Sequence, residues 1–335
     1  MFTKLLAAAF AQRSGLLAQL HAEGTTAYRL FHGSTEGIAG LTVDRYGMLL
    51  LIQSFHQSLT QLELETVQQF YAQVLPDLKP VYNDRSAAYS RIQNALAAEH
   101  TEAAHQTYIA NELGLQYHIR ARHEGQDPWL FLDLRATRRY ILAHAQGKSV
   151  LNLFAYTCGV GMAAAKGGAR QVVNIDFSAS SLAVGQDNAR LNDLSTHVEF
   201  IQSDAFSALR QLCGIGQATR VRGKILPAFP KLAPALFDLV LLDPPRYAKS
   251  PFGVVDLVND YPAIFKLALL STKPGGQLIC CNNVAQVPRQ SWLEQLYRSA
   301  QKAGRPIHSH TWILPEADFP SPDGNPPLKT VVLSV

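Results

Sequence analysis

The stretch Ser149-Val-Leu-Asn-Leu-Phe-Ala-Tyr-Thr-Cys-Gly-Val-Gly161 joins an apolar strand to a glycine-containing turn that opens a helix. Similar apolar runs recur to the end of the chain, and helical stretches separate the first five. Strands that are apolar throughout, with helices between them, are typical of a parallel sheet covered on both faces. The seven runs are SVLNLF, QVVNID, HVEFIQ, FDLVLLD, QLICCN, HTWIL and KTVVLSV. Because the last two leave no room for a helix between them, we predict an antiparallel hairpin at one edge of the sheet.

The chain has 335 residues, of which 47% are hydrophobic and 17% charged. This length suits two domains better than one. Residues 1–125 combine short strands, punctuated by glycines, with helical stretches, and they predict a small α+β domain. Residues 126–335 hold the seven apolar runs and predict the catalytic domain. The sequence contains no run of eighteen apolar residues, so it predicts no membrane span.

Charge is distributed unevenly between the two halves. Residues 1–128 carry 9 basic and 12 acidic side chains, whereas residues 129–335 carry 21 and 14. The second half is therefore the candidate half for an anionic partner such as RNA, and the alternative is an ordinary basic enzyme surface. Four cysteines without a CxxC or Cys/His spacing indicate reduced thiols in the cytoplasm and no metal site.

A basic insert separates the third helix of this half from the FDLVLLD strand. It spans residues 214–235 and carries Arg220, Arg222 and Lys224 without an acidic side chain. A long loop of this kind is either an RNA-contacting lid or a solvated linker.

Ligands of open α/β sheets bind where the parallel strands end. Here Gly159, Asp176, Asp204 and Asp243 follow four of the strands. Two cofactors fit this pattern. Gly159-x-Gly161-x-x-Ala164, with Asp176 17 residues after Gly159, is compatible with NAD and an oxidoreductase. S-adenosylmethionine (SAM) fits as well, with its ribose on Asp176 and its adenine amino group on Asp204.

The turn Asp243-Pro-Pro245 favours SAM. Each proline restricts the residue before it to extended conformations, so the turn is rigid and directs its polar atoms to one point. A flat base could stack there beside a cofactor methyl group, and a dehydrogenase has no use for such a turn.

Together these motifs resemble the SAM-dependent methyltransferases that modify bases of bacterial 23S ribosomal RNA, either cytosine at C5 or guanine at N7. The motifs are Phe131-Leu-Asp133-x-Arg135-x-Thr-Arg-Arg139, Leu151-Asn-Leu-Phe-Ala-Tyr-Thr157, Gly167-Gly-Ala-Arg170, Asp176-x-Ser178, Asp243-Pro-Pro245 and Asn282-Asn283. The resemblance covers about residues 26–335. It implies a class I SAM-dependent methyltransferase fold, Rossmann-like and seven-stranded, preceded by the smaller domain. The chain departs from the cytosine enzymes in one respect, since we expect their amino-terminal RNA-binding PUA domain to be absent here.

The resemblance and the strand-tip argument together give the expected site. The residues that contact SAM are Phe131, Asp133, Arg135 and Arg138 as a lid, and Phe154, Tyr156, Thr157, Gly159, Asp176, Phe177, Ser203, Asp204, Ala205 and Asp243 around the pocket. The expected catalytic residues are Asp243, Pro244, Pro245, Asn282 and Asn283. The expected RNA contacts are Arg246, Arg220, Arg222 and Lys224.

One position separates the two chemistries. The nucleophilic cysteine of the cytosine enzymes aligns with Asn283, and the Ser-Asn-Asn of the guanine enzymes matches Cys281-Asn282-Asn283. Cytosine C5 needs a thiolate to attack the ring first, whereas guanine N7 already carries a lone pair. We therefore expect direct transfer to a ring nitrogen. Cys280 and Cys281 keep the covalent route open as the alternative.

Overall fold

The structure is a computed structural model that describes residues 2–87, 98–123, 127–216, 220–221, 224–225, 229–245, 247–250 and 253–335. The chain divides into two compact units. The first comprises Met1–Arg135 and Pro315–Pro322, and the second comprises Ala136–Leu314 and Asp323–Val335. The first unit thus extends beyond the boundary expected at residue 125, and it also includes the segment Pro315–Pro322 from near the end of the chain.

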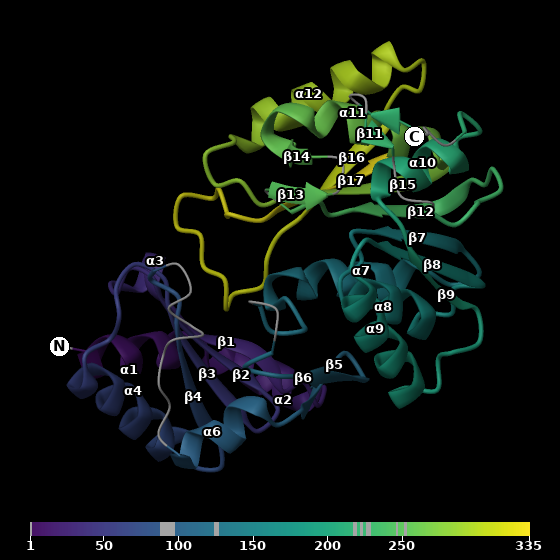
Figure 1. Ribbon diagram of the computed structural model, residues 1–335. Helices are drawn as coiled ribbons and strands as arrows, with labels where there is room; N and C mark the ends of the chain where they lie inside the picture. Colours follow the sequence, from purple (N-terminus) through teal and green to yellow (C-terminus); the bar gives the residue numbers. More distant parts are fainter. Residues whose placement is uncertain are drawn as a thin grey trace. The chain divides into compact units, whose positions relative to one another are not determined.

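The second unit is built on a seven-stranded sheet with the order β16-β17-β15-β12-β7-β8-β9 (Figure 1). The five strands from β15 to β9 are parallel, whereas β17 runs antiparallel to both β15 and β16. This confirms the predicted sheet and its final hairpin. The strands are β7 Ser149–Leu153, β8 Gln171–Asp176, β9 Val198–Gln202, β12 Phe237–Leu242, β15 Thr272–Asn282, β16 Ser309–Ile313 and β17 Lys329–Ser334.

Helices cover both faces of this sheet. The helices α10 to α12 pack on the face that carries Leu151 and Leu153 of β7. On the other face, Gly161 of α8 lies against Asn174 of β8, and Thr137 of α7 contacts Thr330 of β17. The helices are α7 Arg135–His144, α8 Gly159–Lys166, α9 Ala179–Leu191, α10 Ala205–Leu212, α11 Leu257–Leu270 and α12 Arg289–Lys302. No described helix is long and apolar enough to cross a bilayer.

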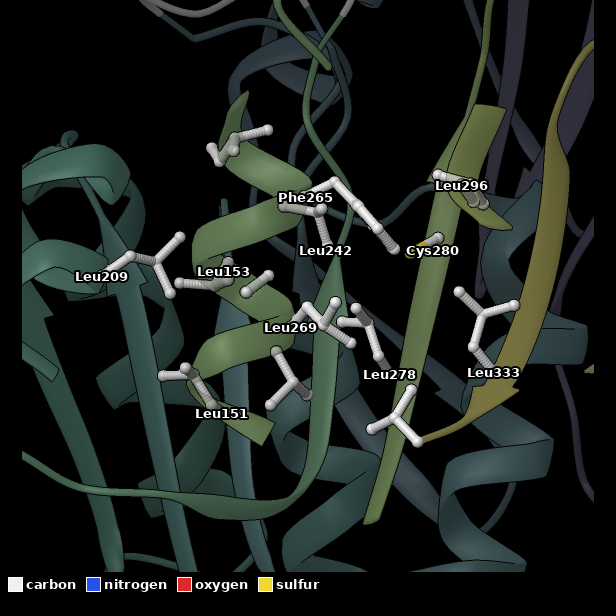
Figure 2. Packing of buried hydrophobic residues seen from close by; sticks show 14 of the residues in the cluster. Leu151, Leu153, Leu209, Leu242, Phe265, Leu269, Leu278, Cys280, Leu296 and Leu333 are labelled. Atoms are coloured by element: carbon white, nitrogen blue, oxygen red, sulfur yellow. The ribbon is translucent and has the colours of Figure 1, made fainter. Parts of the chain in front are cut away.

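The main core of the second unit lies between α11 and the middle of the sheet. Figure 2 shows Phe265 and Leu269 of α11 directed at Leu242 of β12 and Cys280 of β15, and all four side chains are fully buried. Each large apolar side chain buried in this way contributes about 1.5–3 kcal/mol. This packing fixes the ends of β12 and β15, where Asp243 and Asn282 lie.

Two small hairpins interrupt the α/β pattern. The basic insert contains β10 Arg220–Val221 and β11 Lys224–Ile225, which pair antiparallel. A second hairpin, β13 Tyr247–Ser250 and β14 Gly253–Asp256, follows the Asp-Pro-Pro turn. Neither hairpin was predicted, because strands of two to four residues leave no periodic signal in a sequence.

The first unit contains a four-stranded sheet with the order β1-β2-β3-β4, in which only β3 and β4 are parallel. A separate hairpin, β5–β6, follows α6. The strands are β1 Ala27–His32, β2 Leu41–Tyr46, β3 Leu49–Ser54, β4 Lys79–Asp84, β5 Tyr108–Glu112 and β6 Leu115–Ile119. The helices are α1 Phe2–Gln12, α2 Ser14–Ala22, α3 Gly33–Glu36, α4 Gln61–Val74, α6 Ala98–His105 and the short 3₁₀ helix η1 Leu132–Leu134.

Arg13 separates the helices α1 and α2. The buried guanidinium of Arg13 pairs with Glu36 and donates hydrogen bonds to the carbonyl oxygens of Ala9 and Arg29. These partners lie up to 23 residues away, so an apolar periodicity could not reveal the break.

Asp318 anchors the returning segment Pro315–Pro322 inside the first unit. One carboxylate oxygen accepts a hydrogen bond from Arg135 Nη2 at 2.6 Å, and the other accepts one from the backbone N of Arg29 at 3.0 Å. Arg135 also pairs with Glu316 at 2.8 Å and donates to the carbonyl oxygen of Ala27. Asp318 and Arg135 are both fully buried. Removing one member of such a pair leaves a buried charge without compensation.

We predict that Asp318→Ala lowers the free energy of unfolding by about 3–5 kcal/mol, because Arg135 would keep its buried charge with a weaker partner. Denaturant unfolding measures the change. Asp77→Ala, at an exposed site of the same unit, is the control and should lie within about 0.5 kcal/mol of the wild type. Equal stability of Asp318→Ala and the control would contradict an anchoring role.

Candidate active site at the carboxyl ends of the strands

The parallel strands present their carboxyl ends along one edge of the sheet. After β7, the chain forms β8 and β9 on one side of this strand. It then returns and forms β12 and β15 on the other side. Strand order therefore reverses between β7 and β12, which is where ligands of open α/β sheets bind. Phe154, Asp176, Ser203, Asp243 and Asn283 directly follow or end these five strands, so the structure brings the expected strand-tip residues to one edge.

The turn after β7 has an unusual backbone. Phe154, Tyr156 and Cys158 all adopt positive φ angles, of 57°, 49° and 63°. Side chains other than glycine rarely occupy this region, at a cost of about 1–3 kcal/mol each. Such strain persists only where the surrounding structure holds it, and it is concentrated at functional sites.

Three hydrogen bonds hold this turn in place. The backbone N of Tyr156 donates to Asp176 Oδ2 at 2.8 Å, and the backbone N of Ala155 donates to the carbonyl oxygen of Ile175 at 3.0 Å. From α9, Asn188 Nδ2 donates to the carbonyl oxygen of Thr157 at 3.3 Å. The turn is therefore fastened to the end of β8 and to α9.

Cys158 occupies the last of the three strained positions and ends the turn before Gly159 opens α8. Its side chain is fully buried, and burial raises the pKa of the thiol well above its usual range. Gly185 of α9 makes room for it, because a Cβ atom there would lie 2.5 Å from Cys158 Sγ. Cys158 thus packs within the fold.

We predict that Gly185→Ala destabilises the protein by about 1–3 kcal/mol through overpacking against Cys158. The double variant Gly185→Ala/Cys158→Ala should lose less than the sum of the two single variants, by at least about 0.5 kcal/mol. Gly15→Ala is the control, because this helical glycine has open space around it, and the change should leave stability equal or higher. Strictly additive losses, measured by denaturant unfolding, would show that the two residues do not interact.

Acceptor groups and an exposed ring lie at the ends of β8 and β9. The buried Asp176 carboxylate accepts hydrogen bonds from the backbone N of Tyr156 and of Ser178, both at 2.8 Å, while burial raises its pKa. The next residue, Phe177, exposes 47% of its surface. Asp204 caps α10 by accepting from the backbone N of Ser207 at 3.0 Å, and burial also raises its pKa. A nucleoside has hydroxyl and amino donors and a flat base, so these groups suit it.

The ends of β12 and β15 form the other half of the edge. Asp243 is half-buried, Pro244 is buried, and Pro245 is half-buried. On β15, Asn282 Oδ1 accepts a hydrogen bond from the backbone N of Val284 at 2.9 Å, whereas Asn283 is exposed. The two asparagines therefore differ: Asn282 shapes the turn, and Asn283 is exposed.

Lys329, at the start of β17, braces the same turn. It pairs with Asn282 in the sheet register and exposes only 1% of its surface. Its Nζ donates to the carbonyl oxygens of Val284, Pro326 and Pro327 at 3.0, 3.4 and 3.1 Å. Three carbonyls match the three N–H donors of an ammonium group. Val284 is thus held at both its N–H and its carbonyl oxygen, which fixes the conformation around Asn283.

The cysteines near this edge lie inside the sheet. Cys280 and Cys281 are fully buried, and burial raises the pKa of Cys280 to about 12. Cys281 Sγ lies 3.5 Å from Thr330 Oγ1. Tyr261 of α11 donates to the Cys281 carbonyl oxygen at 3.0 Å. Both sulfurs are therefore enclosed by neighbouring side chains.

The remaining expected residues belong to several parts of the chain. Phe131, Asp133 and Arg135 belong to the first unit, and the Arg135 guanidinium is engaged by Glu316, Asp318 and Ala27. Arg138 is buried on α7, and Thr157 and Ala205 are buried beside the strand tips. Arg220 and Lys224 lie in β10 and β11, while Arg222 and Arg246 lie outside the described residues. The described part of the chain contains no cluster of three metal-ligating side chains.

Sequence reasoning overlooked two supporting interactions. Lys329 binds three carbonyl groups, one of them 45 residues away at Val284, and no local pattern indicates this. Gly185 gave no signal, because nothing in the sequence relates it to Cys158, 27 residues earlier. Both are contacts between elements distant along the chain.

The reversed strand order, the final antiparallel hairpin and the acceptor groups at the strand tips together define a class I SAM-dependent methyltransferase. Comparison with known proteins agrees, since the S-adenosylmethionine-dependent methyltransferase family matches residues 28–333. The chain belongs to this family and is a SAM-dependent methyltransferase. SAM, and not NAD, is therefore the cofactor of the two that fit the sequence.

Individual relatives are similar over most of their length. The ribosomal RNA large subunit methyltransferase I of Shewanella frigidimarina is 30% identical over 292 residues, which cover 85% of this chain and 67% of that protein. The ribosomal RNA large subunit methyltransferase of Deinococcus radiodurans is 29% identical over 306 residues, covering 90% and 70%. A SAM-dependent methyltransferase from Streptococcus mutans has the same fold, with a TM-score of 0.78 and 23% identity over 100% of this chain and 81% of that one.

Proposed function

We propose that this enzyme methylates a base of large-subunit ribosomal RNA, and that the methyl group goes to a ring nitrogen, as at guanine N7. The names of the relatives support the RNA substrate. The nitrogen assignment rests on the groups found at the end of β15: Asn283 is exposed there, whereas both nearby cysteines are buried. A ring nitrogen needs no enzyme nucleophile, whereas carbon 5 of cytosine needs a thiolate.

In this proposal the residues of β8 and β9 hold the cofactor. Asp176 accepts hydrogen bonds from the ribose hydroxyls, Phe177 lies against the adenine ring, and Asp204 accepts from the adenine amino group. Tyr156 and Phe154 border the methionine part, beside the start of α8 at Gly159, and Ser203 and Ala205 complete the adenine side. Bound SAM supplies an electrophilic methyl group, and its sulfonium sulfur takes the electron pair of the S–CH3 bond.

The residues of β12 and β15 then orient the acceptor base. The rigid Pro244–Pro245 turn offers a flat surface for it, and Asn283 offers amide donor and acceptor atoms. The positive charge of the sulfonium passes to the base, and the Asp243 carboxylate stabilises that charge by its proximity. The lone pair of the acceptor nitrogen makes the new bond, so no proton needs to leave during transfer to N7.

Mass spectrometry of rRNA nucleosides tests this function. We expect cells that lack the gene to lose one 7-methylguanosine from large-subunit rRNA, and the purified enzyme with SAM should restore it. Loss of a 5-methylcytidine instead would contradict transfer to nitrogen. Unchanged rRNA nucleosides would contradict the RNA substrate.

Calorimetry tests the cofactor role of Asp176. We predict that Asp176→Asn weakens SAM binding by about 10- to 150-fold, because hydrogen bonds to a charged acceptor are worth about 1.5–3 kcal/mol. The control is Asp193→Asn, an exposed site of the same unit whose φ of 55° asparagine tolerates. Unchanged affinity in a folded Asp176→Asn protein would refute the ribose role.

A further inference from the structure

The edge strand β16 ends at the same edge of the sheet as the active site. Ile313 pairs with Thr330 of β17, and Thr330 pairs in turn with Cys281 of β15. The end of β16 is therefore level with the Asn282–Asn283 turn. Two strand spacings, about 10 Å, separate β16 from β15. A nucleic acid whose base reaches Asn283 would pass close to this strand.

Four side chains form a continuous surface here, which we call the Arg289–Trp312 surface: Arg289, Tyr297, His310 and Trp312. Arg289 and Tyr297 come from α12. His310 and Trp312 are two residues apart in β16, so they lie on the same face of the strand. The Arg289 guanidinium lies 4.8 Å from the centre of the Trp312 ring, and Tyr297 Oη lies 3.0 Å from His310 Nδ1. The His310 and Trp312 rings meet edge to face at 6.3 Å. His310 is exposed, and the other three are half-buried.

The stacking on Trp312 positions Arg289 without using its hydrogen-bond donors. Within the part of the chain that the structure describes, no carboxylate or carbonyl group pairs with this guanidinium. Among the described residues, Arg13, Arg29 and Arg135 are instead bound to acids. A stacked guanidinium with free donors forms a fork that fits phosphate.

Arg289 is the basic side chain of this surface, and α12 contains one acidic side chain, Glu294. Glu294 accepts a hydrogen bond from Gln290. Flat rings beside a cation are the combination by which proteins hold single-stranded nucleic acids.

We propose that the Arg289–Trp312 surface binds the RNA strand next to the base being methylated. Arg289 holds a phosphate, and the exposed His310 ring stacks on a neighbouring base. This assignment rests on the proposed RNA substrate and extends it. A protein strand pairing with the free edge of β16 is the competing occupant, and such pairing would use backbone groups and not Arg289.

Binding of a mixed-sequence single-stranded RNA and of a large-subunit rRNA transcript tests the surface in the full-length protein. We expect Arg289→Met to weaken RNA binding about tenfold and to reduce the slope of log K against log[salt] by about 0.7–1, the loss of one phosphate contact. In methylation assays KM for RNA should rise, while kcat and SAM affinity stay unchanged. Arg289→Lys should restore the salt slope but only part of the affinity, because it keeps the charge without the fork.

Arg298→Met is the matched control, because Arg298 is exposed and lies nine residues further along α12, on its opposite side. It should change RNA affinity less than twofold. RNA affinity and salt slope of Arg289→Met equal to those of the wild type would overturn the proposal, as would a wild-type protein that binds neither RNA. If binding depends on Arg289 but no rRNA base is methylated, the surface stands and the proposed function fails.

Discussion

The Asp176 carboxylate is the interaction on which the active-site edge depends. It accepts from the backbone N of Tyr156 and of Ser178, so it joins the turn after β7 to the end of β8. That turn places three residues other than glycine at positive φ. Such residues rarely adopt this conformation, so the surrounding contacts must hold it. The acid at the end of β8 thus has a structural role in addition to its proposed cofactor role.

The opposite half of the edge is stabilised by different means. The core around α11 fixes β12 and β15, and Lys329 holds the turn after β15 through carbonyl groups alone. The Asn282 side chain accepts a hydrogen bond within that turn, whereas the Asn283 amide is exposed. In the proposed function, this arrangement separates two tasks: polar groups of β8 and β9 hold the cofactor, and a braced turn orients the base.

The fold was largely predictable because the inner strands of the sheet are buried on both faces and therefore mostly apolar. FDLVLLD and QLICCN have this pattern, and the short interval between HTWIL and KTVVLSV required a hairpin. The strand-tip position of Asp176, Asp204 and Asp243 followed from the parallel order alone. Their contacts to SAM and RNA are still proposals.

Features that depend on distant contacts could not be predicted. The return of Pro315–Pro322 to the first unit depends on Asp318 meeting Arg135 and Arg29. The break at Arg13 depends on Glu36, and the room for Cys158 depends on Gly185. In each case a polar or small residue acts through a partner far away in the sequence, so local patterns carry no trace of it.

A crystal structure with S-adenosylhomocysteine bound is the most direct measurement of the central claim. The account predicts that both ribose hydroxyls lie within hydrogen-bonding distance of Asp176 and that the Tyr156 turn keeps its positive φ angles. A ribose bound away from Asp176, or a turn that relaxes to negative φ when the ligand binds, would contradict it.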